Sequence, residues 1–136
     1  MLVDLTAVLL QFRFVTIAIL SDIEKAFLQL QIAEEDRTYV RFLWFSRDGS
    51  MVMYWFTRVA FGIVASPFLM NAVIRYHIDN NVNEFSEQVR RDFYADNMCT
   101  GAESAEKAVE LYTKTKELFC RCSMNLRSWV TNDETV

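Results

Sequence analysis

Hydrophobic positions along the first third of the chain change from helical spacing to strand spacing. Apolar side chains three or four positions apart predict a helix over residues 3–13. Residues 14–20 follow as a nearly continuous apolar run rich in β-branched side chains, which favours a central strand covered on both faces. One short helix over residues 24–31 is expected next, before a charged and solvated turn at residues 33–37.

The second third of the chain contains a hairpin signal. Two runs of strand-forming residues, 38–45 and 51–57, are joined by a segment that contains Asp48-Gly49. Because an Asp-Gly pair suits the tight turn between two antiparallel strands, we predict a β-hairpin here. Arg41 and Arg58 lie on its strands, where a solvated ion pair is the simpler role and a phosphate contact is the alternative.

A loop and a helix follow this hairpin. Gly62 permits a close approach of backbone within the loop, and Ser66 with Pro67 forms a helix start in which Ser66 is the cap and Pro67 lies in the first turn. The helix is predicted to run from about Pro67 to His77. Residues 78–88 are polar, and a break is expected at Asn80-Asn81.

A second hairpin is predicted around residue 95. Phe93 and Tyr94 are aromatic strand formers, and the turn formers Asp96 and Asn97 follow them directly. The return strand is expected over residues 98–100, with a stop at Gly101. Such a tip would present the carboxylate of Asp96 to solvent.

The last third combines one long helix with one strand. Apolar positions keep helical spacing from Ser104 to Cys122, and residues 125–131 favour a short final strand before an exposed end at 132–134. The order strand, hairpin, helix, hairpin, helix, strand predicts an α+β fold, in which helices back one face of an antiparallel sheet and leave the other face free.

Composition limits the class of protein. The 136 residues are enough for one domain, residues 1–136, with a real core, and the 52% hydrophobic content excludes a disordered tail. The 14 basic and 18 acidic residues give a net charge of −4. Because nucleic-acid binders usually carry a basic excess, this balance counts against tight nucleic-acid binding by this chain alone.

Cysteine usage and hydropathy indicate the cellular compartment in which the protein is expected. The three cysteines lack disulfide spacing, and with a single histidine they form no recognisable zinc set, so a reducing, intracellular setting such as the cytoplasm or a particle is expected. The N-terminus has no basic segment before its apolar run, which argues against a signal peptide. Gln11 and Arg13 interrupt that run, so we expect no membrane span.

Two carboxylates stand out as candidates for chemistry. Asp22 follows the apolar run at 14–20, and Asp96 lies at the predicted tip of the second hairpin. Acidic side chains at adjacent strand ends can hold divalent cations, because Mg²⁺ prefers hard oxygen ligands and is usually bound by one or two carboxylates plus substrate phosphates. Two such ions can clamp both oxygens of an in-line phosphoryl displacement.

Three motifs in this order and spacing resemble the A, B and C motifs of reverse transcriptases. They are Asp22-x-x-x-Ala26-Phe27, Phe61-Gly62-x-x-x-Ser66-Pro67-Phe68 and Tyr94-x-Asp96. The similarity is greatest to the Pao/Bel group of LTR retrotransposons, which is also resembled by the stretches Arg41–Phe45, Ser66–Ala72 and Asn125–Trp129. The resemblance covers nearly the whole chain and is specific as a set.

The resemblance implies a partial reverse transcriptase domain, a palm with incomplete fingers and thumb. It implies dNTP addition to a primer 3′-hydroxyl on an RNA or DNA template-primer, with two Mg²⁺ ions and the remainder of a polyprotein as partners. The implied catalytic residues are Asp22 and Asp96; the implied metal ligands are Asp22, Ile23, Asp96 and Asn97; the implied substrate contacts are Phe27, Phe61, Gly62, Ser66 and Tyr94. From spacing alone, Phe27 is equally well a core aromatic.

The sequence also departs from the family pattern. Motif C ordinarily ends in two aspartates, whereas this chain has Asn97 in the second place, and an amide oxygen is a neutral, weaker Mg²⁺ ligand. Ser128 stands where close relatives often have Lys, and Ala60 where the family usually has Pro. Two hypotheses therefore stand: a polymerase palm fragment, or a catalytically decayed remnant that retains the palm fold.

Overall fold

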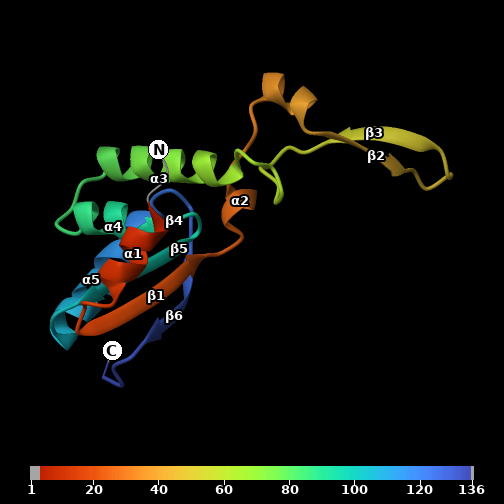
Figure 1. Cartoon of the computed structure of the whole chain (residues 1–136). Coiled ribbons are helices and arrows are strands. Elements are labelled where there is room, and N and C mark those ends of the chain that lie inside the picture. Colours follow the sequence, from red (N-terminus) through yellow and green to blue (C-terminus); the bar gives the residue numbers. More distant parts are fainter. Residues whose placement is uncertain (1–3, 136) are drawn as a thin grey trace.

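A computed structural model describes residues 4–135 and shows a body of helices and strands from which one β-hairpin extends (Figure 1). The helices are α1 (Leu5–Phe12), α2 (Ala26–Gln29), the 3₁₀ helix η1 (Glu34–Tyr39), α3 (Ser66–Asn80), α4 (Ser86–Asp92) and α5 (Ala105–Cys120). The strands are β1 (Ile17–Ile23), β2 (Arg41–Phe45), β3 (Met51–Trp55), β4 (Phe93–Tyr94), β5 (Asn97–Ala102) and β6 (Leu126–Thr131). Within the described part of the chain, no helix has the length and apolar character needed to cross a membrane.

The body is built on a four-stranded antiparallel sheet with the order β4-β5-β1-β6. β1 is central, and its register against β5 runs from Ile17 opposite Ala102 to Asp22 opposite Asn97. Its register against β6 shifts between Leu20 and Asp22, which marks a β-bulge or irregularity. Since β1 is paired on both sides, the residue at its end is held by two neighbouring strands.

The main core lies between this sheet and the helices α3, α4 and α5. Alternate residues of β1, among them Ile17, Ile19 and Ile23, are buried, as the pleat of a strand with one covered face requires. Ile23 belongs to a buried cluster to which α3, α4 and α5 all contribute. In addition, the His77 Nε2 atom lies 2.7 Å from the carbonyl oxygen of Leu118, which ties α3 to α5. The predicted α+β architecture, an antiparallel sheet backed by helices, is confirmed.

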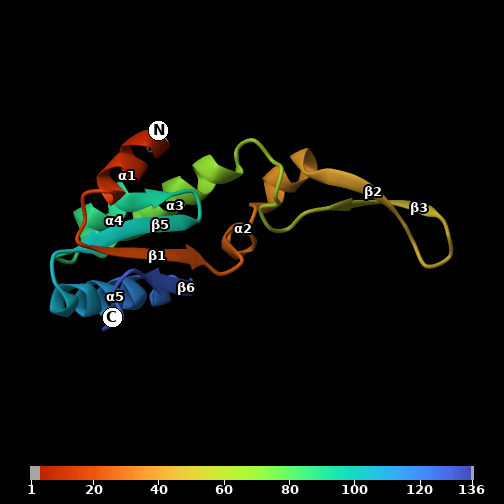
Figure 2. The same ribbon diagram turned by 60° about the horizontal axis from the view of Figure 1, so that its bottom comes forward.

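The face of the sheet opposite this core is only partly free. Leu20 on that face is exposed, but α1 lies over β5, and Figure 2 shows α1 and α5 on opposite sides of β5. The expectation that all helices lie on one face was therefore wrong for α1. The reason is that α1 buries only Val8, so its amphipathic pattern did not show which face of the sheet it covers.

Residues 41–55 form the predicted hairpin. It lies between η1 and the loop that leads to α3. β2 and β3 pair antiparallel from Arg41 opposite Trp55 to Phe45 opposite Met51, and all ten strand residues are exposed. Figures 1 and 2 both show this hairpin extending away from the four-stranded sheet. It is thus an arm whose apolar side chains do not contribute to the core of the body.

Several element boundaries differ from the sequence prediction. The strand predicted from Phe14 begins at Ile17, because Phe14 lies outside the sheet with its side chain exposed. The helix predicted over residues 24–31 is shorter, since Lys25 has a left-handed backbone and Leu30 is extended. Residues 38–40 are not strand, because the 3₁₀ helix η1 extends to Tyr39.

Helix α4 was not predicted, and β5 continues past the expected stop. α4 buries Ser86, Val89 and Asp92, so its inner face is mostly polar and gave no hydrophobic period. Asp92 accepts hydrogen bonds from Thr100 Oγ1 at 2.7 Å and from Arg91 Nε at 2.8 Å, which satisfies the buried carboxylate. Gly101 does not end the strand, because it lies opposite Ala18 in the sheet.

Candidate active site

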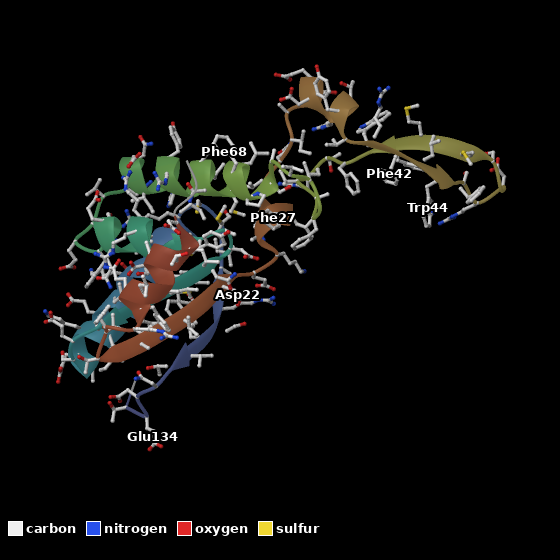
Figure 3. The ribbon with its side chains drawn as sticks, viewed as in Figure 1. Asp22, Phe27, Phe42, Trp44, Phe68 and Glu134 are labelled. Atoms are coloured by element: carbon white, nitrogen blue, oxygen red, sulfur yellow. The ribbon has the colours of Figure 1, made fainter. Side chains whose placement is uncertain are left out.

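The two candidate aspartates come from neighbouring antiparallel strands. Asp22 is the second-last residue of β1 and lies directly opposite Asn97 at the start of β5. The backbone N–H of Ile23 donates to the carbonyl oxygen of Asp96 at 2.9 Å, so the two motifs are joined by main-chain bonding. Figure 3 shows Asp22 at the end of β1 that leads toward α2. The structure thus brings Asp22, Ile23, Asp96 and Asn97 together at one end of the sheet.

The carboxylate of Asp22 is only partly satisfied by the protein. Its Oδ2 accepts from Arg127 Nε at 3.3 Å, whereas Oδ1 is buried and has no hydrogen-bond donor among residues 4–135. The side chain as a whole is 28% exposed. A buried, unbonded carboxylate oxygen at the rim of a sheet is suited to accept a cation or a donor from a bound molecule.

Asp96 lies in a tight turn between β4 and β5. The turn needs a left-handed residue, and Ala95 supplies it at a φ of 54°. Asp and Asn tolerate that conformation better than Ala, yet neither Asp96 nor Asn97 takes it. Asn97 instead uses its side chain locally, since its Nδ2 donates to Asp96 Oδ1 at 2.8 Å. Both candidate carboxylates therefore have one oxygen bonded within the chain.

Sequence reasoning assigned no role to three further side chains at this site. Arg127 contacts Asp22, and its Nη1 also lies 3.8 Å from Glu24 Oε1. Asn125 Nδ2 donates to Glu24 Oε2 at 3.0 Å, so β6 is bonded to the segment that follows β1. The signal that would have found these residues is the register of the last strand, because Arg127 lies opposite Asp22.

Two of the three aromatic residues predicted to contact substrate lie beside each other. Phe27 is buried in the main core, and its ring meets that of Phe61 edge to face with centroids 5.0 Å apart. Phe61 is 69% exposed, so it presents a ring edge or face to solvent. The burial of the Phe27 side chain agrees with its interpretation as a core aromatic. Its contact with the exposed ring of Phe61 shows that it also lies close to the protein surface. Tyr94 is half-buried and lies opposite Asn97.

The loop before α3 is built differently from the prediction. Gly62 has a φ of 85°, and nothing lies within 4 Å of a β-carbon placed there, so Gly62 serves the left-handed backbone and not a close approach. Ser66 is the first residue of α3 and not its cap, since Ala65 is the cap residue. Its Oγ donates to the carbonyl oxygen of Ala60 at 2.8 Å, which closes the loop on itself. Pro67 lies in the first turn, as predicted.

Neither Arg41 nor Arg58 forms the expected ion pair with any carboxylate in residues 4–135. Arg58 Nη1 donates to the carbonyl oxygen of Gln29 at 3.3 Å, and the nearest partner of Arg41 is the sulfur of Met53 at 3.9 Å. The reason is that the exposed hairpin has only one acidic residue of its own, Asp48, at its far turn. Arg41 and Arg58 therefore keep charge that the described chain does not neutralise.

The comparison with protein families is specific. A family model described as "Reverse transcriptase (RNA-dependent DNA polymerase)" matches residues 9–128, a range that includes all of the candidate site residues. The chain belongs to this family. No curated protein matches the chain. Membership in the reverse transcriptase family implies nucleic acid as the substrate, and agrees with the order of motifs around Asp22, Ser66 and Asp96.

Reverse transcriptases normally use divalent metal ions, so the fit of this site to such ions is relevant. The free Oδ1 of Asp22 is a suitable ligand, and the carbonyl of Asp96 accepts from the N–H of Ile23, the residue after Asp22. Within residues 4–135, however, no group of three or more His, Cys, Asp or Glu side chains is arranged to hold a metal ion. The protein thus offers two carboxylates, and further ligands would have to be carbonyl or amide oxygens, substrate or water.

Proposed function

We propose that this reverse transcriptase chain provides the palm of an RNA-directed DNA polymerase and adds dNTP to a primer 3′-hydroxyl. The observation that supports the proposal is the pairing of Asp22 with Asn97, because it brings two carboxylate-bearing motifs from distant parts of the chain to one end of the sheet. Asp22 and Asp96 would hold two Mg²⁺ ions, with the carbonyl of Ile23 and the amide of Asn97 as further ligands. When bound, such ions supply charge stabilisation and lower the pKa of the primer hydroxyl.

The residues of the chain contribute position and charge. The backbone of Asp22 is held by strand pairing and that of Asp96 by the bond from the Ile23 N–H, so both residues are fixed at one end of the sheet before anything binds. The rings of Phe27 and Phe61 are in contact, and Phe27 would pack against the sugar of the incoming nucleotide. The loop closed by Ser66 and Ala60 would line the same pocket. Catalysis would then rest on positioning and electrostatic stabilisation.

Primer extension on an RNA template with Mg²⁺ tests this proposal. Residues 9–128 would replace the corresponding segment of an active reverse transcriptase that supplies fingers and thumb. We expect the unaltered graft to extend primer and Asp22→Asn to lower the rate by at least about 100-fold, because the site loses one of the two carboxylates that would hold the Mg²⁺ ions. Asp36→Asn, which neutralises an exposed carboxylate on η1, is the matched control and should leave the rate unchanged. Extension that persists in Asp22→Asn would contradict the proposal.

A second candidate function is a non-catalytic remnant that retains the palm fold. The observation that favours it is Asn97, whose amide is neutral and donates to Asp96 Oδ1 at 2.8 Å. The variant Asn97→Asp separates the two candidates. If only the Asn97→Asp graft extends primer, this copy has lost its chemistry; if the unaltered graft extends it equally well, the remnant hypothesis is wrong. Far-UV circular dichroism on each sample would identify a misfolded graft.

We also propose a Pao/Bel-type retrotransposon polyprotein as the source, acting inside the cell. Support comes from the stretches around Arg41–Phe45 and Asn125–Trp129, which resemble that group. The neighbouring coding DNA provides the test. Protease and integrase segments in the same reading frame are expected, and a neighbouring frame typical of another retroelement group would contradict this origin.

A further inference from the structure

Arg127 pairs with a carboxylate of the candidate site. It lies on β6 directly opposite Asp22, and its Nε donates to Asp22 Oδ2 at 3.3 Å. Its Nη1 lies 3.8 Å from Glu24 Oε1, so one guanidinium serves two carboxylates. Figure 3 shows that Asp22 lies where the body meets the segment leading to the hairpin. The contact is therefore at the candidate site itself.

This ion pair is not needed to hold β6 in place. Backbone pairing already joins β6 to β1 at Leu126 and Val130, and the hydrogen bond from Asn125 to Glu24 fixes the start of the strand. The Arg127 side chain is 50% exposed, and pairs between such exposed groups contribute little to stability. The position of the charge, beside a carboxylate that is otherwise free on Oδ1, is the more informative feature.

A guanidinium and a divalent cation compete for the same carboxylate. Both need the negative charge of Asp22, they repel each other, and arginine remains charged at every pH that a protein survives. The guanidinium has an alternative partner in Glu24, whose Oε1 lies 3.8 Å from its Nη1. Asp96 differs in this respect, because its internal partner Asn97 is neutral and repels no cation.

We propose that Arg127 is a built-in counter-cation of Asp22 that weakens divalent-cation binding at this site. The inference rests on the metal site of the proposed function. Arg127 occupies Asp22 when no metal is bound, and metal uptake requires its guanidinium to give up the contact with Oδ2. Arg127 is thus a positioning residue that sets the metal concentration at which the site fills.

Binding of Mn²⁺ to the complete 136-residue chain tests this inference without any measurement of catalysis. The electron paramagnetic resonance signal of free Mn²⁺ gives the dissociation constant. We expect Arg127→Gln to tighten binding by about fivefold, the size of effect that a partly exposed ion pair can produce. Arg127→Lys, which keeps the positive charge, should stay near the unaltered chain. Asp22→Asn should abolish the tighter binding, also in combination with Arg127→Gln.

Arg90→Gln is the matched control. Arg90 also pairs with two carboxylates, those of Asp79 and Glu87, and it belongs to α4, away from β6. Its removal changes the net charge by the same amount but leaves the pair of Arg127 and Asp22 intact, so it should leave Mn²⁺ binding at Asp22 unchanged. If Arg90→Gln tightened Mn²⁺ binding as much as Arg127→Gln, the effect would come from the net charge of the chain and not from Arg127, and the inference would be overturned.

The outcomes distinguish this inference from the proposed function. If Asp22→Asn weakens Mn²⁺ binding but Arg127→Gln binds no tighter than the unaltered chain, the counter-cation role is wrong and the metal site stands. If Asp22→Asn changes nothing in either background, the metal site itself is wrong, and the inference falls with it. Far-UV circular dichroism checks the folding of each variant. Arg127→Met, which keeps the alkyl chain, replaces Arg127→Gln if that variant does not fold.

Discussion

Gly101 is a residue of the sheet whose surroundings leave no room for a side chain. A β-carbon built on it would lie 2.5 Å from the carbonyl oxygen of Ile17 and 2.5 Å from Cγ2 of Val15. Neither neighbour is the far end of a flexible side chain, because one is backbone and the other is a short β-branched residue. The glycine therefore allows the close approach of β5 to the start of β1.

We predict that Gly101→Ala lowers the free energy of unfolding by about 2 kcal/mol, because the sheet must shift to accept the methyl group. Urea unfolding followed by circular dichroism measures the change. Ala102→Gly removes a methyl group from the next residue of the same strand and controls for a general sensitivity of this end of β5. An unchanged midpoint for Gly101→Ala would show that β1 and β5 can separate here without cost.

Among single residues, the sequence was sufficient to identify candidate site residues that have a local signature. Asp22 and Asp96 stood out because each follows strand-forming residues, and the structure places them near each other. Their chemistry stays a prediction. Arg127 was not recognised, because its partner is 105 residues away and only the register between β1 and β6 brings the two together. A side chain whose importance lies in a long-range contact has no local signal.

The β2–β3 hairpin is the element least supported by the rest of the protein. All ten residues of the two strands are exposed, and a two-stranded hairpin alone is marginally stable in water. Stacking of Phe42 on Tyr54 and its contact with Phe56 are the main aromatic contacts within the hairpin. Figure 3 labels Phe42 and Trp44 on this arm, well away from Asp22.

We predict that backbone amides of β2 and β3 exchange with solvent deuterium at least about 100-fold faster than those of β1, because local opening of the hairpin exposes no core. Hydrogen exchange with mass spectrometry on the isolated chain measures this. The paired strands β1 and β5 in the same sample are the internal control. Equal protection of the hairpin and β1 would mean that the arm is covered or much more stable than its contacts suggest.

Element types were predicted well where hydrophobic spacing was strong, as for the long helix α5 and the hairpin. Prediction failed where burial is polar. Helix α4 buries Asp92, whose carboxylate is satisfied by Thr100 and Arg91, and no periodicity of apolar residues reveals such a face. Ser66 was assigned as a cap from its type, whereas its hydroxyl bonds to Ala60 within the loop.

The hydrophobic core of the whole molecule consists of two buried clusters, which are connected by residues that pack against both. The larger cluster contains Phe93 and Phe119, whose rings stack at 5.2 Å, and the smaller one contains Ile17 and Leu111. Trp129 packs against both clusters, and its Nε1 donates to the carbonyl oxygen of Leu126 at 3.0 Å. Because they are connected in this way, the body should lose both clusters together.

We predict a single cooperative unfolding transition of the body. The variant with Trp44→Phe and Trp55→Phe leaves Trp129 as the only tryptophan, so its fluorescence reports on the body without the hairpin. Its urea transition should coincide with that of far-UV circular dichroism, as two-state unfolding requires. Separate midpoints would show that the region around Trp129 unfolds independently of the helices.

The central position of β1 also has a consequence for how the protein is made. One neighbour of β1, β5, ends at Ala102, and the other, β6, begins only at Leu126, so this early strand is completed by the latest ones. Contacts over such separations form slowly, whereas the backbone hydrogen bonds within α3 and α5 are local and can form early. During synthesis on the ribosome, the β6 side of β1 therefore remains unpaired until residues 126–131 have emerged. Its dependence on chaperones should consequently be greatest while the chain is still nascent.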